Sequence, residues 1–151
     1  MREIGAFKRL AKPYKFSKSS QERLDQCCEE IQKIINEVVY FMDITITEGS
    51  RTREQQEKYL KAGTSKAKFG QSAHNYTPSL AIDIVPYPVP VNKKGEWDSK
   101  SKKWDDLALI VKSIADEKGI RITWGGDFKS IVDKPHWELT DWKSRVQLIQ
   151  W

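Results

Sequence analysis

The chain has only two histidines, and both lie in polar stretches next to apolar runs. His74 is in "QSAHNYTPSLAID", where Asp83 follows nine residues later within the apolar run "LAIDIV", and His136 begins "HWEL". Two imidazoles and one carboxylate form a ligand set used in catalytic zinc sites, which leave one position for water. An aspartate in an apolar strand is costly to bury unless a cation or strong donor pairs with it. The pattern therefore indicates a metal site formed by His74, Asp83 and His136, and the alternative is a pair of hydrogen-bonded loop histidines.

Two acids close to His136 are candidates for a general base. Asp133 precedes His136 by three residues, and Glu138 follows it by two, on the same face of an extended strand. Either carboxylate could take a proton from an attacking water and pass it to a leaving amine. The spacing alone does not choose between Asp133 and Glu138.

Arg51 lies in a third polar stretch, "EGSRTREQQ", which follows a predicted strand. A planar guanidinium suits bidentate binding of a carboxylate, so Arg51 could hold a substrate carboxylate or steady an oxyanion. The alternative is a structural salt bridge near the start of the next helix.

The composition of the chain limits its class and its partners. A length of 151 residues with 38% hydrophobic and 31% charged residues fits one globular domain, which we place at residues 1–151. No apolar run is long enough to span a membrane, and "MREIGAFKRLAKPYKFS" is too charged for a signal peptide, so we expect synthesis in the cytoplasm. The net charge of +5 favours polyanions, but the lysines are scattered and no nucleic-acid-binding motif is present. We therefore expect no specific nucleic acid partner, and a monomer.

Hydrophobic periodicity predicts helices and strands in alternation. A long helix is expected from a Ser19–Glu22 capping box to Met42, and Gly63 is expected to end a second, polar helix. The remaining expected elements are strands at 44–47, 80–85, 120–124 and 136–139, a helix at 104–115, and a terminal helix after an N-cap at Thr140. This order predicts the α+β class, with a small mixed or antiparallel sheet covered by helices.

Three stretches together resemble a known family. They are "TEGSRTREQQEKYLKAG", "SAHNYTPSLAIDIVPYP" and "ITWGGDFKSIVDKPHWEL", which span roughly residues 46–139. In these motifs the chain resembles the zinc D-Ala-D-Ala carboxypeptidase and L-alanyl-D-glutamate endopeptidase family, which includes VanY-like enzymes and phage endolysins. The resemblance implies a hedgehog/D,D-peptidase-like fold and zinc bound by His74, Asp83 and His136.

The same resemblance assigns roles to other residues. It implies that Asp133 rather than Glu138 is the catalytic base and that Arg51 faces the substrate. It also places Ser72 in the site, although a hydroxyl that stabilises a turn is an alternative reading. The family's W-G-G-D motif matches residues 124–127, so Trp124 and Asp127 are expected to contact substrate.

The chain departs from the family pattern between the first two ligands. The family has seven residues from histidine to aspartate, with a single glycine where this chain has Thr77-Pro78-Ser79, which makes the step nine. We expect this segment to bulge outward, stiffened by Pro78.

The resemblance implies a zinc-dependent peptidase that acts on the peptidoglycan stem peptide, as a phage-type endolysin cutting after L-alanine. Such an enzyme is made in the cytoplasm and acts on the cell wall after release, when the host is lysed. Two alternatives are a D,D-carboxypeptidase or dipeptidase of the same family, and a catalytically inactive wall-binding module.

Overall fold

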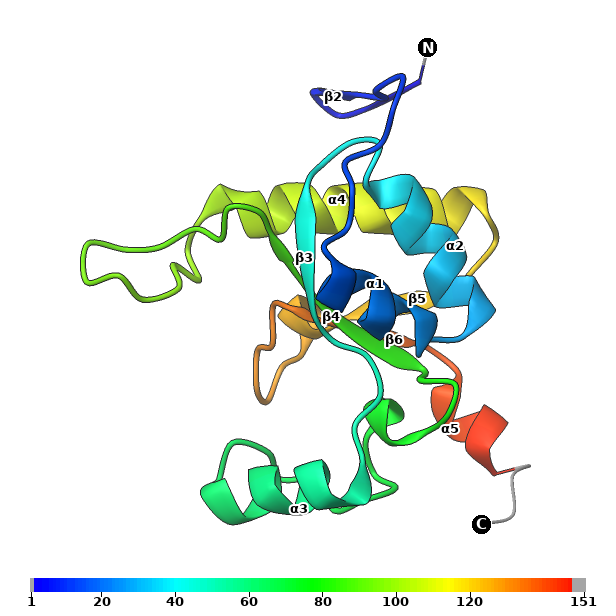
Figure 1. Ribbon diagram of the computed structural model, residues 1–151, viewed down its shortest axis with the longest axis vertical. Coiled ribbons are helices and arrows are strands. Elements are labelled where there is room, and N and C mark those ends of the chain that lie inside the picture. The colour runs from blue at the N-terminus through cyan, green and yellow to red at the C-terminus, as the bar shows by residue number, and fades with distance from the viewer. Residues whose placement is uncertain (1, 148–151) are drawn as a thin grey trace.

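An antiparallel sheet of four strands forms the centre of the protein in a computed structural model that describes residues 2–147 (Figure 1). The strand order is β3-β4-β6-β5. The strands are β3 (Ile44–Glu48), β4 (Ala81–Pro86), β5 (Ile122–Trp124) and β6 (His136–Leu139). A separate N-terminal hairpin pairs β1 (Glu3–Ile4) with β2 (Phe7–Lys8).

Helices cover the sheet and complete the core. They are α1 (Lys18–Asp25), α2 (Glu29–Val38), α3 (Arg53–Ala62), α4 (Lys102–Glu117) and α5 (Trp142–Val146), with short 3-10 turns η1 (Ala73–Asn75) and η2 (Gly125–Asp127). Helix α1 packs against β3, and α4 packs against both β4 and α2. Helix α3 lies apart from this layer at the foot of the view in Figure 1. The predicted α+β class is confirmed, and every described strand pairing is antiparallel.

The alternation of side chains in β4 and β6 separates a core face from a polar face. Ile82 and Ile84 are fully buried, as is their neighbour Trp137 in β6. Because successive residues of a strand point to opposite faces, Asp83 and His136 project from the other side of the sheet. The apolar residues therefore anchor the strands while the polar residues between them remain available for a site.

The long helix predicted from Ser19 to Met42 is wrong, because the chain forms two helices there. Cys28 has an extended backbone and precedes α2 as its N-cap. The backbone groups at the break bond to a distant segment: the Ser79 amide donates to the Gln26 carbonyl at 2.8 Å, and the Cys28 amide donates to the Ser79 carbonyl at 2.9 Å. This tertiary pairing replaces the helical hydrogen bonds that the periodicity implied.

Two predicted helix caps also differ from the structure. Ser17, not Ser19, caps α1, since its hydroxyl accepts from the Ser20 amide at 3.1 Å. Asp141, not Thr140, is the N-cap of α5, and the predicted continuation through residues 148–151 lies outside the described residues. The helix predicted to end at Gly63 is confirmed, because Gly63 closes α3 in the left-handed conformation that glycine tolerates.

None of the described helices is long and apolar enough to cross a membrane.

Candidate metal centre

Strand register brings two of the predicted ligands side by side. Asp83 of β4 is paired with His136 of β6, and on its other side Asp83 is paired with Glu48 of β3. These three residues therefore form a row across the polar face of the sheet. The pairing explains why residues 53 positions apart place Asp83 Oδ1 and His136 Nδ1 at 3.2 Å.

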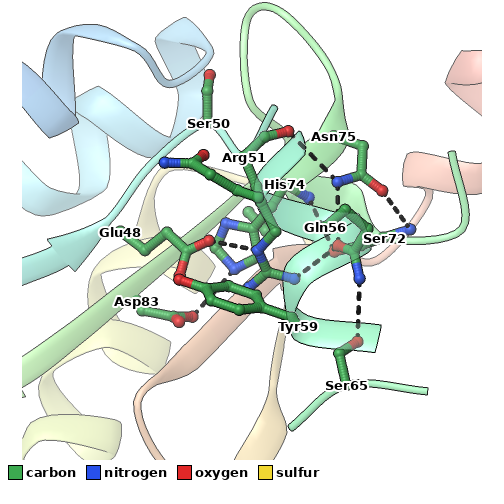
Figure 2. Close-up of polar contacts among 12 residues, drawn as sticks. Glu48, Ser50, Arg51, Gln56, Tyr59, Ser65, Ser72, His74, Asn75 and Asp83 are labelled. Carbon is green, nitrogen blue, oxygen red and sulfur yellow. Dashed lines mark hydrogen bonds and ion pairs between the residues drawn. The ribbon is translucent and has the colours of Figure 1, made fainter. Parts of the chain in front are cut away.

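His74 reaches this row from the loop that precedes β4. It lies in the η1 turn, whose N-cap Ser72 accepts from the His74 amide at 3.3 Å, while the Asn75 side chain accepts from the Ser72 amide at 3.2 Å. The His74 carbonyl also accepts from the Arg51 amide at 2.7 Å. These bonds fix the turn, and Figure 2 shows His74 and Asp83 pointing toward one another.

Three ligand atoms of different segments converge on one point. His74 Nε2 lies 3.1 Å from Asp83 Oδ1 and 3.2 Å from His136 Nδ1, which is itself 3.2 Å from the same carboxylate oxygen. Four ligands at about 2.0–2.1 Å from a zinc ion are about 3.3–3.4 Å apart in a tetrahedron. The triangle of ligand atoms therefore has nearly the size that three ligands of a tetrahedral ion require. Among the described residues, these three form a group able to hold a metal ion.

The outer nitrogens of both imidazoles have acceptors, and this determines what the inner nitrogens present. His74 Nδ1 lies 2.6 Å from the Gly49 carbonyl, and His136 Nε2 lies 2.7 Å from Glu138 Oε1. Each outer nitrogen must donate its proton, so in the neutral ring the inner nitrogen carries a lone pair. Two lone pairs and a carboxylate oxygen then face one another, which is favourable only around a positive charge.

The shifted pKa values of Asp83 and His136 show that the cluster attracts positive charge, either a proton or a metal ion. Burial alone would raise the pKa of Asp83, but hydrogen bonds with His136 and His74 outweigh it and hold the pKa well below its usual range. Burial lowers the pKa of His136, but hydrogen bonds with Asp83 and Glu138 outweigh it and raise the pKa to about 9. His74 and His136 are both buried, so water screens the cluster weakly. The cluster thus concentrates negative potential in a shielded position.

Asp133 lies at the rim of this cluster, on the loop that leads into β6. Its amide donates to the Gly125 carbonyl at 2.9 Å, and its carbonyl accepts from the His136 amide at 3.2 Å. A side chain on Gly125 would place Cβ 2.2 Å from the Asp133 carbonyl, so only glycine permits this close approach. Partial burial, followed by the charge of Asp83, raises the pKa of Asp133, although its side chain remains exposed to solvent.

Glu138 has a different environment, which spacing alone did not reveal. One carboxylate oxygen accepts a hydrogen bond from His136 Nε2, and the other accepts one from the Trp142 indole at 2.8 Å. Both oxygens are therefore engaged on the side of His136 that faces away from the ligand cluster. Trp142 was not predicted as part of the site, and no local sequence signal links it to His136.

Ser79 also supports the cluster, and it belongs to the three-residue segment that departs from the family pattern. Thr77 and Pro78 are exposed, as the predicted outward bulge requires, but Ser79 is fully buried. Its hydroxyl lies 3.1 Å from the Gly49 carbonyl and 2.7 Å from the Ala81 carbonyl. Ser79 therefore approaches the same Gly49 carbonyl that orients His74.

Arg51 is held beside the cluster at the β3 edge. Its Nε donates to Glu48, its Nη1 donates to Gln56 at 2.9 Å, and its guanidinium lies 4.7 Å from the centre of the Tyr59 ring (Figure 2). The Arg51 side chain is 11% exposed. Within residues 2–147, the hydrogen bonds described for this guanidinium use two of its five N–H donors.

The other residues predicted to contact substrate have structural partners. The Ser72 hydroxyl caps the η1 turn. Trp124 is buried, stacks on Trp137 with ring centres 5.8 Å apart and donates to the Lys134 carbonyl at 2.7 Å. Asp127 forms an ion pair with Lys112 at 2.7 Å on the surface. Contact of Ser72, Trp124 and Asp127 with substrate stays a prediction.

The fold and the cluster together define a class: an α+β protein with a His–Asp–His group able to hold a metal ion on the polar face of an antiparallel sheet. Comparison with known proteins narrows this class. The family model for phage L-alanyl-D-glutamate peptidases matches residues 12–141. The chain therefore belongs to the phage L-alanyl-D-glutamate peptidase family.

Two relatives support the assignment. The peptidoglycan L-alanyl-D-glutamate endopeptidase CwlK of Bacillus subtilis (strain 168) is 32% identical in an alignment 115 residues long, which covers 65% of this chain and 61% of CwlK. The crystal structure of the L-Ala D-Glu endopeptidase ChiX of Serratia marcescens matches with a TM-score of 0.69 and 25% identity, over 88% of this chain and 95% of that one. The chain thus spans about three fifths of the length of CwlK.

Proposed function

We propose that this protein is a zinc-dependent peptidoglycan peptidase that cuts the stem peptide between L-alanine and D-glutamate. The observation that carries the proposal is the convergence of two imidazole lone pairs and one carboxylate oxygen within 3.2 Å of one another. Family membership and the names of CwlK and ChiX support the choice of bond.

The donor set favours zinc over other common ions. Two nitrogens and one oxygen suit Zn²⁺, whereas Mg²⁺ and Ca²⁺ prefer oxygen ligands. His74, Asp83 and His136 would hold the ion and leave one position for water or substrate. Zinc bound there would polarise the scissile carbonyl and lower the pKa of water.

Asp133 is the proposed general base. It lies at the rim of the cluster, and its backbone is fixed by hydrogen bonds to Gly125 and His136. From this position its carboxylate accepts a proton from the attacking water and returns it to the leaving amine of D-glutamate. Glu138 is a poorer candidate, since its two oxygens already accept from His136 and Trp142.

Arg51 is the proposed contact for a carboxylate of the substrate. Glu48 and Gln56 hold its guanidinium in one orientation, and its remaining N–H donors suit bidentate binding. The α-carboxylate of D-glutamate, next to the scissile bond, is the matching group.

Digestion of purified peptidoglycan tests this function. Wall material is incubated with zinc-loaded protein, with and without a chelator, and the products are analysed by mass spectrometry. New N-terminal D-glutamate that disappears with chelator is the expected result. Released D-alanine would instead identify a D,D-carboxypeptidase, and binding without cleavage would identify an inactive wall-binding module. Three further points stay predictions: the protein is a monomer, it is made in the cytoplasm, and it acts on the wall after release.

A further inference from the structure

A cavity of about 460 Å³ lies next to Asp133, between two loops. One wall comes from the loop at residues 87–101 and the start of α4, and the other from the loop at residues 128–135. The loops are tied together where Lys134 Nζ donates to the Ser99 carbonyl. Both loops extend on the left side of the view in Figure 1.

One wall of the cavity is aromatic: it is formed by Trp97, which lies against the buried Trp104. Trp97 is 50% exposed, and its ring centre lies 6.0 Å from that of Trp104. Trp104 is buried, and its indole donates to the Asp98 carbonyl at 3.0 Å, which fixes the end of the loop. Trp97 therefore presents an indole surface to solvent on a rigid support.

The opposite wall is also apolar at its surface. Val132 is 58% exposed, and Pro135 lies beside it along the cavity. Lys100 adds an exposed ammonium group at the edge. Largely apolar walls with a few polar groups are typical of small-molecule sites, and a tryptophan left half in water is commonly found at binding surfaces.

The position of the cavity decides which part of the substrate it faces. Glu48, Asp83 and His136 form a row across the sheet, and Arg51 is bound to Glu48 at the β3 end of this row. Asp133 and Pro135, which line the cavity, lie three residues and one residue before His136, so the cavity adjoins the β6 side of the site. If Arg51 holds the D-glutamate carboxylate, the acyl side of the scissile bond runs toward the cavity.

We propose that this cavity binds the sugar ring of the muramyl residue, which peptidoglycan carries on the amino side of L-alanine. The inference rests on the proposed function and extends it from the bond to the acyl-side substituent. An N-acetylated sugar is uncharged, so it needs no arginine, and its C–H face packs on the indole of Trp97. Its acetamide and hydroxyl oxygens are acceptors for the Lys100 ammonium group.

Two soluble substrates separate sugar binding from peptide binding. The first is N-acetylmuramyl-L-alanyl-D-glutamate, and the second is N-acetyl-L-alanyl-D-glutamate, which has the same scissile bond and α-carboxylate without the sugar. We expect the wild-type protein to have a lower KM for the first, and Trp97→Ala to raise that KM by about tenfold. The KM for the sugar-free substrate is expected to stay unchanged, and Trp97→Phe, which keeps an aromatic ring, is expected to restore most of the difference.

Tyr87→Ala is the matched control, since Tyr87 is a 62% exposed aromatic residue outside this cavity. Equal effects of Trp97→Ala on both substrates would overturn the proposal and show a structural role for the loop. The absence of any wild-type preference for the muramyl substrate would overturn it as well.

A binding measurement keeps the inference separate from the proposed activity. The product N-acetylmuramyl-L-alanine is titrated into ¹⁵N-labelled protein, and the indole N–H signals are followed by NMR. A shift of the Trp97 indole signal during the titration supports the sugar site even if no bond is cut. Shifts confined to residues outside the cavity would overturn it.

Discussion

The Glu138 carboxylate accepts a hydrogen bond from His136 Nε2 at 2.7 Å and thereby points the other ring nitrogen at Asp83 and His74. Under the proposed function, this relationship would give Glu138 a part in metal binding without contact with the metal. It also separates the roles of the two acids that flank His136, because Asp133 lies at the rim of the cluster while Glu138 lies behind a ligand.

Replacing Glu138 is expected to weaken zinc binding. In Glu138→Gln the amide oxygen still accepts from His136, but the amide nitrogen then faces the Trp142 indole donor and the negative charge is lost. Loss of such an outer partner lowers metal affinity by about 10–100-fold. Competition with a chromogenic chelator measures the affinity, with Glu57→Gln on the exposed face of α3 as control. Unchanged zinc affinity combined with lost turnover would mean that Glu138 is the base.

Replacing Asp133 is expected to have the opposite pattern. Asp133→Asn should keep the zinc, because the three ligands are untouched, and should reduce kcat by about 10²–10⁴-fold through loss of proton transfer. Bound zinc is measured by elemental analysis, and turnover by release of the peptide product. Asp116→Asn, an exposed acid on α4, is the control. Should Asp133→Asn lose its zinc instead, Asp133 is a ligand and the assignment is wrong.

Removal of zinc is expected to lower thermal stability without unfolding the protein. The core formed by α2, α4 and the apolar face of the sheet does not include the cluster, so the chelated protein keeps its far-UV circular dichroism spectrum. Free zinc at 100 times its Kd stabilises by about 2.7 kcal/mol. For a domain of this size that corresponds to a rise in Tm of about 5–10 °C. A His74→Ala variant should lose most of this rise, and an equal rise in that variant would place the zinc elsewhere.

Ser79→Ala tests whether the extra residues between the first two ligands support the site. The substitution removes a buried hydroxyl from the Gly49 carbonyl, which is also the acceptor for His74. A loss of about 1–3 kcal/mol in the free energy of unfolding is expected, together with weaker zinc binding. Chemical denaturation and chelator competition measure the two effects. The exposed neighbour Thr77→Ala should change neither, and a zinc affinity unaffected by Ser79→Ala would limit Ser79 to a role in stability.

The two adjacent cysteines are expected to resist alkylation in the folded protein. Both are buried, and burial raises the pKa of the Cys27 thiol to about 12 and raises that of Cys28. At pH 8 the reactive thiolate of Cys27 is therefore rare, and access to either sulfur is blocked. Mass spectrometry after treatment with iodoacetamide should detect no adduct until denaturant is added. Rapid labelling of the native protein would show that the break between α1 and α2 opens readily.

The parts of the fold that follow from local pattern were predictable from the sequence. The apolar run "LAIDIV" and the capping residues around α3 determine those elements without help from the rest of the chain. The break at Gln26–Cys28 was not predictable, because it depends on hydrogen bonds with Ser79, more than fifty positions away in the chain. Apolar residues continue at helical spacing through the break, so periodicity alone indicated one helix.

In the candidate site, too, some residues could be predicted from local sequence and others depend on tertiary contacts. His74, Asp83 and His136 were identifiable because their types and surroundings are unusual for a core, and the structure brings all three together. Glu138 remained ambiguous because spacing shows that it shares a strand face with His136 but not which ring nitrogen it meets. The contributions of Gly49, Ser79 and Trp142 depend on a backbone carbonyl and on tertiary packing, which leave no motif in the sequence.

The separation of the ligands along the chain has a consequence for biosynthesis. His74 and His136 are 62 residues apart, and Asp83 meets His136 only when β4 and β6 have paired. A nascent chain that ends before β6 holds one imidazole and one carboxylate, too few ligands to compete for zinc. Metal uptake would therefore occur only after the sheet is complete. An unfinished or misfolded chain would not cleave the wall.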